Sequence, residues 1–158
     1  MTRQPFSSHS RFAQRVQRRY EQQLHLLPVG VPDQASMAAL CQALLTQGFD
    51  LGAALRITRQ LVLERLLQLD CDEKTPLASI TQSMTDLAEF ALSQACSEVE
   101  RTQNLKHGAP CTPAGTSAKL WVMGMGKLGA WELNVSSDID LIYIYDHDGD
   151  TAGDAQGC

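Results

Sequence analysis

The residues best suited to chemistry lie in segment 120–141, whose sequence is LWVMGMGKLGAWELNVSSDIDL. An apolar run there leads into a turn that holds three glycines: Gly124, Gly126 and Gly129. Because glycine has no Cβ, the backbone at such positions can approach a phosphate group closely. The first half of the segment therefore predicts a phosphate-binding turn, in which Lys127 is a candidate to contact phosphate oxygens.

Two carboxylates follow this turn after a spacer of ten residues, 128–137. Asp138 and Asp140 stand two apart in a segment whose apolar residues predict a strand, at 139–145. Alternate residues of a strand point to the same face, so the two carboxylates are expected to share one or two Mg²⁺ ions. Ser136 and Ser137, just before the pair, are predicted either to bind phosphate or to form the turn.

The same glycines also fit the G-x-G-x-x-G fingerprint of NAD-type dinucleotide-binding domains. That fold needs a full crossover helix after the turn and an acidic residue about 20 positions further on. Here eight residues, 130–137, separate the turn from Asp138, and they predict a short helix of about two turns. NAD-type binding is therefore the weaker alternative. A Walker A loop is excluded because Leu128 follows Lys127 where Ser or Thr should hold the metal.

The turn and the carboxylates together resemble the signature of a known family. Gly-Met-Gly-Lys-Leu-Gly at 124–129, followed by Glu-Leu-Asn-Val-Ser-Ser-Asp-Ile-Asp-Leu at 132–141, is similar to the bifunctional glutamine synthetase adenylyltransferase/adenylyl-removing enzymes. That family belongs to the DNA polymerase β-like nucleotidyltransferase superfamily. Lys127 departs from the Ser usual in the superfamily, and Ala130-Trp131 departs from the Gly and basic residue more frequent in the family.

The resemblance implies a specific reaction and a set of partners. The Asn-Val-Ser-Ser lead-in at 134–137 looks like the amino-terminal copy of the family's module, which removes AMP from a tyrosine of glutamine synthetase by phosphorolysis and yields ADP. The other half of the family's enzymes adenylylates glutamine synthetase with ATP. The implied ligands are Mg²⁺, ATP or ADP, and phosphate, and the implied partners are glutamine synthetase and the PII signalling protein. The implied catalytic metal ligands are Asp138 and Asp140, and the implied nucleotide- and phosphate-binding residues are Gly124, Gly126, Lys127, Ser136 and Ser137.

The composition of the chain indicates which classes of protein it can belong to. The chain has 158 residues, 44% of them hydrophobic and 20% charged, with a net charge of −5. An acidic balance gives no support to nucleic-acid binding. No apolar run is long enough for a membrane span and no signal-peptide core follows Met1, so we expect a soluble, cytoplasmic protein. The five cysteines, at 41, 71, 96, 111 and 158, form no C-x-x-C pair and are predicted to be free thiols.

The elements that must position the site are predicted by hydrophobic periodicity and helix-start signals. Helices are expected at 11–27, 34–46 and 51–69, and a long helix is expected to begin at Thr75-Pro76. A linker is expected at 104–117, and strands at 119–125 and 139–145. The acidic stretch after the second strand lacks the spacing of a calcium loop and is predicted to be a solvated turn.

The predicted fold class is α+β. A helical amino-terminal region, 1–107, and a linker, 108–118, precede the first two strands of a polymerase β-like nucleotidyltransferase domain, 119–158. A two-stranded ribbon is marginal alone, and the superfamily draws a third carboxylate from a later strand. We therefore expect a truncated fragment of a longer enzyme that is inactive alone. The alternative is a non-catalytic helical interaction module whose short sheet only packs.

Overall fold

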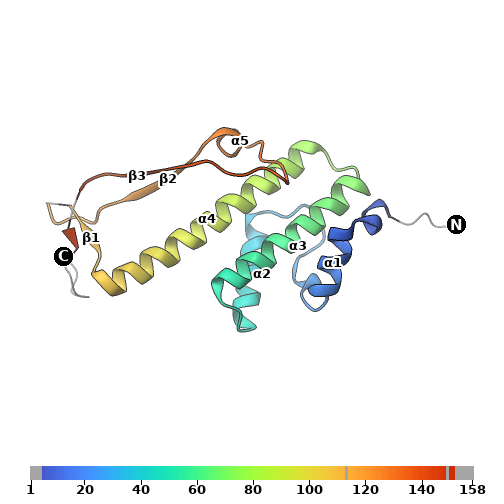
Figure 1. The fold of residues 1–158 in the computed structure, drawn as a ribbon, viewed down its shortest axis with the longest axis horizontal. Coiled ribbons are helices and arrows are strands. Elements are labelled where there is room, and N and C mark those ends of the chain that lie inside the picture. The colour runs from blue at the N-terminus through green and yellow to red at the C-terminus, as the bar shows by residue number, and fades with distance from the viewer. Residues whose placement is uncertain (1–4, 113, 149, 152–158) are drawn as a thin grey trace. The chain divides into compact units, whose positions relative to one another are not determined.

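The computed structural model describes residues 5–112, 114–148 and 150–151, and these form an α+β chain, which confirms the predicted class (Figure 1). The helices are η1 (Phe6–His9), α1 (Arg11–Arg19), η2 (Leu24–Leu26), α2 (Gln34–Thr46), α3 (Leu51–Cys71), α4 (Leu77–His107) and α5 (Gly126–Gly129). The strands are β1 (Pro110–Cys111), β2 (Leu120–Gly124), β3 (Leu141–Tyr145) and β4 (Asp150–Thr151). The chain divides into two compact units, one formed by 1–91 and 131–137, the other by 92–130 and 138–158.

The helices of the first unit begin at side-chain caps that the sequence supplies. The Ser10 hydroxyl oxygen accepts from the Ala13 N–H at the start of α1, and the Asp50 carboxylate accepts from the Ala53 N–H at the start of α3. At the start of α2, Asp33 and Ser36 form a capping box, in which each side chain bonds the other's backbone. Such caps satisfy backbone N–H groups that have no partner inside the helix.

The predicted first helix, 11–27, is wrong in its second half. α1 ends at Arg19, and Tyr20 already has φ −119° and ψ 29°. Leu27 is extended, at φ −92° and ψ 120°, because the ring of the following Pro28 disfavours the helical conformation. A short 3₁₀ helix, η2, fills the gap between these two points. The predicted second helix agrees with α2, and the third continues two residues further, to Cys71.

α4 begins directly after Pro76 and continues to His107, so the first four residues of the predicted linker, 104–107, are helical. A further difference is that β1 lies inside the same predicted linker and pairs antiparallel with β4. β4 also places a strand at Asp150, within the acidic stretch that was predicted to be a solvated turn, and the residues after Thr151 lie outside the described part.

The core of the first unit is formed by leucines and other apolar side chains of α1 to α4. Those less than 2% exposed include Val16, Met37, Leu40, Leu44, Leu61, Val62 and Leu66. Along α3 the buried positions include 54, 57, 58, 61, 62, 66 and 69, the spacing that places side chains on one helical face, and positions 63 and 64 are buried beside them. The periodicity in the sequence thus locates the helix face that packs inward.

A buried hydrogen bond connects α4 to the loop before α2. The Ser83 hydroxyl, in a residue 1% exposed, donates to the Pro32 carbonyl at 2.6 Å. We expect Ser83→Ala to lower the free energy of unfolding by about 1–2 kcal/mol, because it leaves a buried carbonyl without this donor. Urea unfolding followed by circular dichroism measures the change. Ser93→Ala, at an exposed position of the same helix, should change it by less than about 0.5 kcal/mol, and equal losses in both variants would contradict the assignment.

Three of the five cysteines, Cys41, Cys71 and Cys96, are free thiols as predicted. Burial raises the pKa of the Cys41 thiol. The prediction is wrong for Cys111, which is disulfide-bonded, and Cys158 lies outside the described residues. None of the helices in the described part of the chain has both the length and the apolar character that crossing a membrane requires.

Candidate functional site

The second unit holds an antiparallel ribbon of β2 and β3. Its register pairs Leu120 with Tyr145 at one end and Gly124 with Leu141 at the other. One hydrogen bond continues this ladder past the last paired strand residues, because the Met125 N–H donates to the Asp140 carbonyl at 2.9 Å. The glycine turn and the second aspartate are therefore neighbours across the same end of the ribbon.

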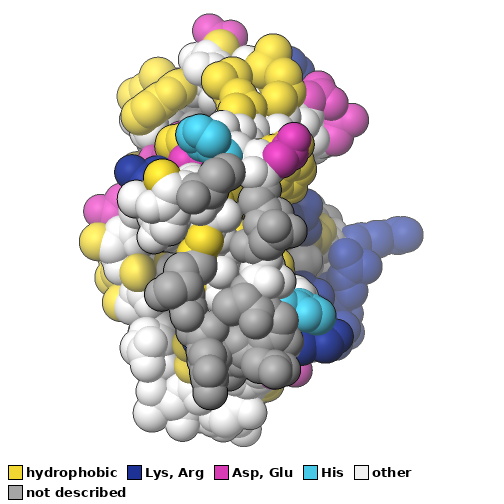
Figure 2. Space-filling view, turned by 90° about the vertical axis from the view of Figure 1, so that its left-hand side faces the viewer, with side chains coloured by type: hydrophobic (Ala, Val, Ile, Leu, Met, Phe, Trp, Pro, Cys, Tyr) yellow, Lys and Arg dark blue, Asp and Glu magenta, His cyan; other side chains and the backbone are white. Residues whose placement is uncertain are grey.

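The ribbon leaves much apolar surface in contact with solvent. Figure 2 shows apolar side chains gathered at the surface toward the top of that view. On β2 and β3 the exposed large apolar side chains are Leu120, Trp121, Met123, Ile142, Tyr143, Ile144 and Tyr145. This exposure agrees with the expectation that two strands with apolar faces are marginal by themselves.

The aspartate pair lies just before the strand and not inside it. β3 begins at Leu141, and residues 138–140 have no assigned secondary structure, so the predicted strand start at 139 is wrong. The cause is the partner strand, which ends at Gly124 and turns into α5 after Met125, leaving Asp138 and Ile139 without a paired residue. Strand alternation therefore does not set the direction of the two carboxylates. Both residues are exposed.

The helix predicted in the spacer 130–137 is also wrong. α5 is a single turn that ends at Gly129, and Ala130 is its C-cap. Further on, the Ser137 N–H donates to the Asn134 carbonyl at 3.1 Å, and the Ser137 hydroxyl donates to the Asn134 side-chain oxygen at 2.6 Å. Segment 134–137 is therefore a turn.

Each of the three glycines in the turn occupies a position where a residue with a Cβ would be strained or would clash. Gly126 has φ +53°, in the left-handed region that residues with a Cβ rarely adopt. A Cβ on Gly124 would lie 2.7 Å from Cγ of Leu128, and a Cβ on Gly129 would lie 2.5 Å from the Gly124 carbonyl oxygen. The turn is thus folded tightly on itself around Leu128, which is 5% exposed.

Leu128 is the part of the turn that sequence reasoning missed. The sequence signal for it was present, since it is the apolar residue between Lys127 and Gly129 in a glycine-rich stretch. Its burial gives Gly124 a packing role, because a Cβ at Gly124 would meet the Leu128 side chain. The structure brings Gly124, Gly126 and Asp140 to one end of the ribbon.

The remaining predicted site residues are exposed or in turns. Lys127 is exposed within α5, and Ser136 is exposed in the 134–137 turn. Ser137 is half-buried, and its hydroxyl is engaged by Asn134, which fits the turn-forming role that the sequence left open. Contact of these three residues with phosphate stays a prediction.

The chemistry of the carboxylates fits a divalent cation. Asp138 and Asp140 take part in no ion pair among the described residues, and two carboxylates that share a site repel each other unless a cation joins them. Oxygen ligands are those that Mg²⁺ prefers, and Mg²⁺ is commonly held by one or two carboxylates together with substrate phosphates. Within the described ranges no group of three His, Cys, Asp or Glu side chains could hold a metal, and binding of Mg²⁺ by the two carboxylates stays a prediction.

The strand directions argue against the dinucleotide-binding alternative. In a Rossmann unit the strands before and after the glycine turn are parallel and are joined by a crossover helix. Here β2 and β3 are antiparallel, and the helix between them is α5, four residues long. The short spacer in the sequence had already favoured this outcome.

The opposite end of the ribbon is closed by Asp146. Its carboxylate accepts from the Lys119 N–H at 2.9 Å, and this bond holds the pKa of Asp146 below its ordinary value of 3.8. A carboxyl whose pKa is lowered on folding contributes stability that is complete above its unfolded pKa and is lost as the pH falls through its folded pKa.

We therefore expect the Lys119 amide resonance to titrate with a midpoint below pH 3.8. A pH series of proton-nitrogen NMR spectra measures it, and Asp146→Asn should remove the titration while keeping an acceptor oxygen. A midpoint at or above the ordinary aspartate value would contradict the bond.

Comparisons with known proteins agree on one family. A family model described as glutamate-ammonia ligase adenylyltransferase matches residues 8–157. The chain is similar to proteins named bifunctional glutamine synthetase adenylyltransferase/adenylyl-removing enzyme from two bacteria. It is 41% identical over 129 residues to that of Burkholderia pseudomallei, covering 78% of this chain and 14% of the relative. It is 42% identical over 118 residues to that of Aromatoleum aromaticum, covering 73% and 13%. The chain thus spans a small part of the length of these relatives.

Proposed function

Since this chain belongs to the glutamate-ammonia ligase adenylyltransferase family, we propose that its glycine turn and aspartate pair serve Mg²⁺-dependent nucleotidyl transfer. The relatives' name joins two activities, adenylyl transfer to glutamine synthetase and adenylyl removal from it. We assign this chain to the adenylyl-removing half. The support for that half is the sequence Asn-Val-Ser-Ser at 134–137, which resembles the amino-terminal copy of the family's module.

The observation that carries the proposal is the bond between the Met125 N–H and the Asp140 carbonyl. It joins the two halves of the motif, which are separated by more than a dozen residues in sequence, at one end of one ribbon. Gly126 in the left-handed conformation then exposes the backbone of the turn beside the aspartates. A nucleotide phosphate needs such an open backbone together with cationic charge.

Each residue receives a role in this proposal. Asp138 and Asp140 hold Mg²⁺, which when bound neutralises phosphoryl charge and orients the displacement. Lys127 and the backbone N–H groups near Gly126 contact phosphate oxygens. Ser136 or Ser137 donates a further hydrogen bond once the turn opens toward the nucleotide.

The proposed reaction is a phosphorolysis, in which phosphate displaces the tyrosine from AMP. An oxygen of inorganic phosphate attacks the phosphorus of the tyrosine-bound AMP, and a new phosphorus-oxygen bond forms as the bond to the phenolic oxygen breaks. The tyrosine leaves with a proton and ADP is released. The residues of this chain supply binding and orientation, because little covalent chemistry is left for the protein in phosphoryl transfer.

The proposed partners follow from the same family. Glutamine synthetase is the protein substrate, ATP or ADP and phosphate are the small-molecule ligands, and the PII signalling protein is a regulatory partner. The family resemblance supports all of them, and the name of the relatives supports glutamine synthetase in particular.

Binding and turnover test the proposal separately. We expect the 158-residue chain to bind ADP in the presence of Mg²⁺ in isothermal titration, and to lose this binding when the metal is chelated. We expect no ADP release when Mg²⁺, phosphate and adenylylated glutamine synthetase are added, because the described residues group no third metal-ligating side chain with the pair. Absence of any ADP binding would favour a non-catalytic helical interaction module, and clear turnover would refute the two-carboxylate limit.

A further inference from the structure

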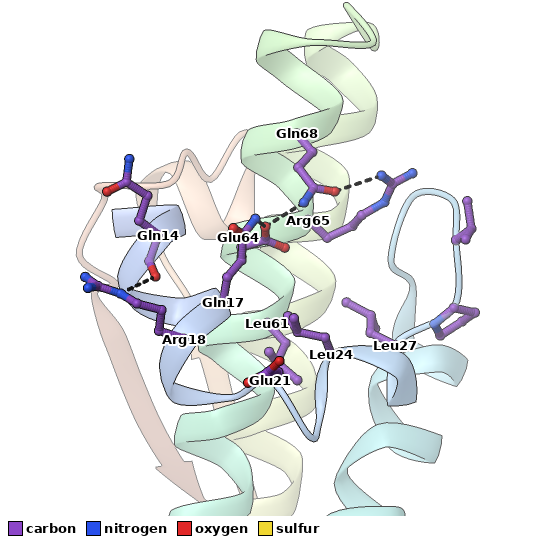
Figure 3. Close-up of a pocket in the computed structure, with 12 residues that line it drawn as sticks. Gln14, Gln17, Arg18, Glu21, Leu24, Leu27, Leu61, Glu64, Arg65 and Gln68 are labelled. Carbon is purple, nitrogen blue, oxygen red and sulfur yellow. Dashed lines mark hydrogen bonds between the residues drawn. The ribbon is translucent and has the colours of Figure 1, made fainter. Parts of the chain in front are cut away.

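The helical unit contains a cavity lined by polar and charged side chains that the nucleotidyl-transfer proposal does not use. The cavity, of about 680 Å³, opens between α1, α3 and the loop that holds η2 (Figure 3). Its lining includes Glu64 of α3, a carboxylate only 5% exposed. Charged side chains are almost never buried to this extent unless they are paired, so the surroundings of Glu64 are informative.

One oxygen of this carboxylate is fully engaged. Oε1 of Glu64 accepts from the side-chain amide of Gln17 at 2.7 Å and from that of Gln68 at 2.5 Å. The Gln68 amide is oriented from its other side, because its oxygen accepts from Arg65 at 3.2 Å. Both amide donors converge on Glu64 in Figure 3. The carboxylate is therefore held in a fixed position.

The other oxygen, Oε2, accepts no hydrogen bond from the described residues. Both hydrogen bonds to the Glu64 side chain among the described residues end on Oε1. Among the described residues, the Thr58 hydroxyl is the only fully buried side-chain polar atom without a hydrogen-bond partner. Oε2 of Glu64 is therefore not fully enclosed by protein atoms and must be in contact with solvent. The cavity that Glu64 lines is the space that provides this contact.

No basic side chain neutralises Glu64. Among the described residues its carboxylate forms no ion pair. Arg65, one residue along the helix, is committed elsewhere, since it donates to Glu73 at 2.8 Å and to the Gly30 carbonyl at 3.0 Å. Arg18 and Arg65 both line the cavity, but neither forms an ion pair with Glu64 among the described residues, and the Nε of Arg18 donates to the Gln14 carbonyl at 3.2 Å. Burying a carboxylate without a cationic partner is costly.

The rest of the cavity wall contains both apolar and polar side chains. The apolar ones are Leu24, Leu27, Pro28, Val29 and Leu61, and the polar or charged ones are Gln14, Arg18, Glu21 and Arg65. Ligand sites typically combine apolar side chains with a few convergent polar groups, in volumes of about 300–1,000 Å³. This combination suits a molecule with a short aliphatic body and one positively charged hydrogen-bond donor.

We propose that this cavity binds a small organic cation, a primary ammonium on a short alkyl chain, whose head donates to Oε2 of Glu64 and whose chain lies against the leucines. The two glutamine amides fix the carboxylate in advance, so binding does not require the site to reorganise. The proposal concerns the helical unit alone and is independent of the nucleotidyl-transfer assignment.

The test uses the whole 158-residue chain and butylammonium chloride as the probe. Proton-nitrogen NMR follows the side-chain amides of Gln17 and Gln68, which touch the same carboxylate. We expect saturable shifts of both amides with butylammonium. Sodium chloride at equal ionic strength and neutral butan-1-ol at equal concentration should not produce them. Shifts of equal size with butan-1-ol, or no saturation, would overturn the proposal without any variant.

A pair of variants then tests the charge. Glu64→Gln keeps the side-chain shape and should weaken butylammonium binding about tenfold or more, because a charge-assisted bond is replaced by a neutral one. Glu21→Gln is the matched control, since Glu21 lines the same cavity but is exposed, and exposed charges contribute little. An unchanged affinity in Glu64→Gln, or equal losses in both variants, would overturn the proposal.

Discussion

Replacing Asp138 and Asp140 together by asparagine is expected to weaken Mg²⁺-dependent ADP binding by about a hundredfold or more. Changes in residues that only support a metal ligand already cost 10- to 100-fold in metal affinity, and these residues are the proposed ligands themselves. Asparagine keeps the shape and one oxygen but removes the negative charge that Mg²⁺ requires. Isothermal titration with ADP at fixed Mg²⁺ measures the loss.

Asp146→Asn is the matched control for this pair. Asp146 lies at the opposite end of the same ribbon, where its carboxylate accepts from the Lys119 N–H. Its replacement removes one negative charge from the same unit, so it separates local metal ligation from a general change in charge. We expect ADP affinity to stay within about twofold of the parent. Equal losses in the control and in the double variant would contradict the proposed ligand assignment.

The second large effect is expected from Gly129→Ala. An added Cβ would lie 2.5 Å from the Gly124 carbonyl oxygen, and a backbone atom cannot move aside as the end of a flexible side chain can. The turn must therefore open, at a cost of about 1–3 kcal/mol, the usual range for overpacking. Amide hydrogen exchange in β2 and β3 measures the loss of local stability, and ADP titration should show weaker binding with it.

Gly52→Ala provides the control for this substitution. A Cβ at Gly52, in the first turn of α3, would meet only Nη1 of Arg56 at 3.3 Å and a carboxylate oxygen of Asp50 at 3.4 Å. Alanine in a helix is favoured over glycine by about 0.5–1 kcal/mol, so no loss of stability is expected. If Gly129→Ala left exchange in the ribbon unchanged, the tight turn around Leu128 would be contradicted.

The helical elements could be predicted wherever local signals are strong. Asp33 and Asp50 stand at cap positions before apolar periodic stretches, and Pro76 stands just before α4, so the starts of three helices are evident from sequence. The stretch 20–27 was wrongly predicted to be helical because its leucines continue the spacing of α1, whereas the backbone leaves the helical conformation at Tyr20. Pro28 restricts the conformation at Leu27, but it does not mark where α1 ends.

The site was predictable in composition and less so in geometry. The spacing of glycines and aspartates places the glycine turn and Asp140 at one end of a ribbon, as the Met125 to Asp140 bond shows, whereas their roles as site residues stay a prediction. The start of β3 was not predictable from the apolar residues alone, because it depends on where the partner strand turns away at Gly124. Likewise, the single turn of α5 follows from the steric fit of Gly129 against Gly124, a contact that periodicity does not reveal.

Paramagnetic NMR with Mn²⁺ in place of Mg²⁺ tests most directly the claim that the aspartate pair and the glycine turn form one metal site. We predict that substoichiometric Mn²⁺ broadens the amides of Met125, Gly126 and Asp140 first, that adding ADP strengthens the effect, and that Asp138→Asn with Asp140→Asn removes it. Broadening that begins elsewhere in the chain, or that persists unchanged in the double variant, would contradict the account.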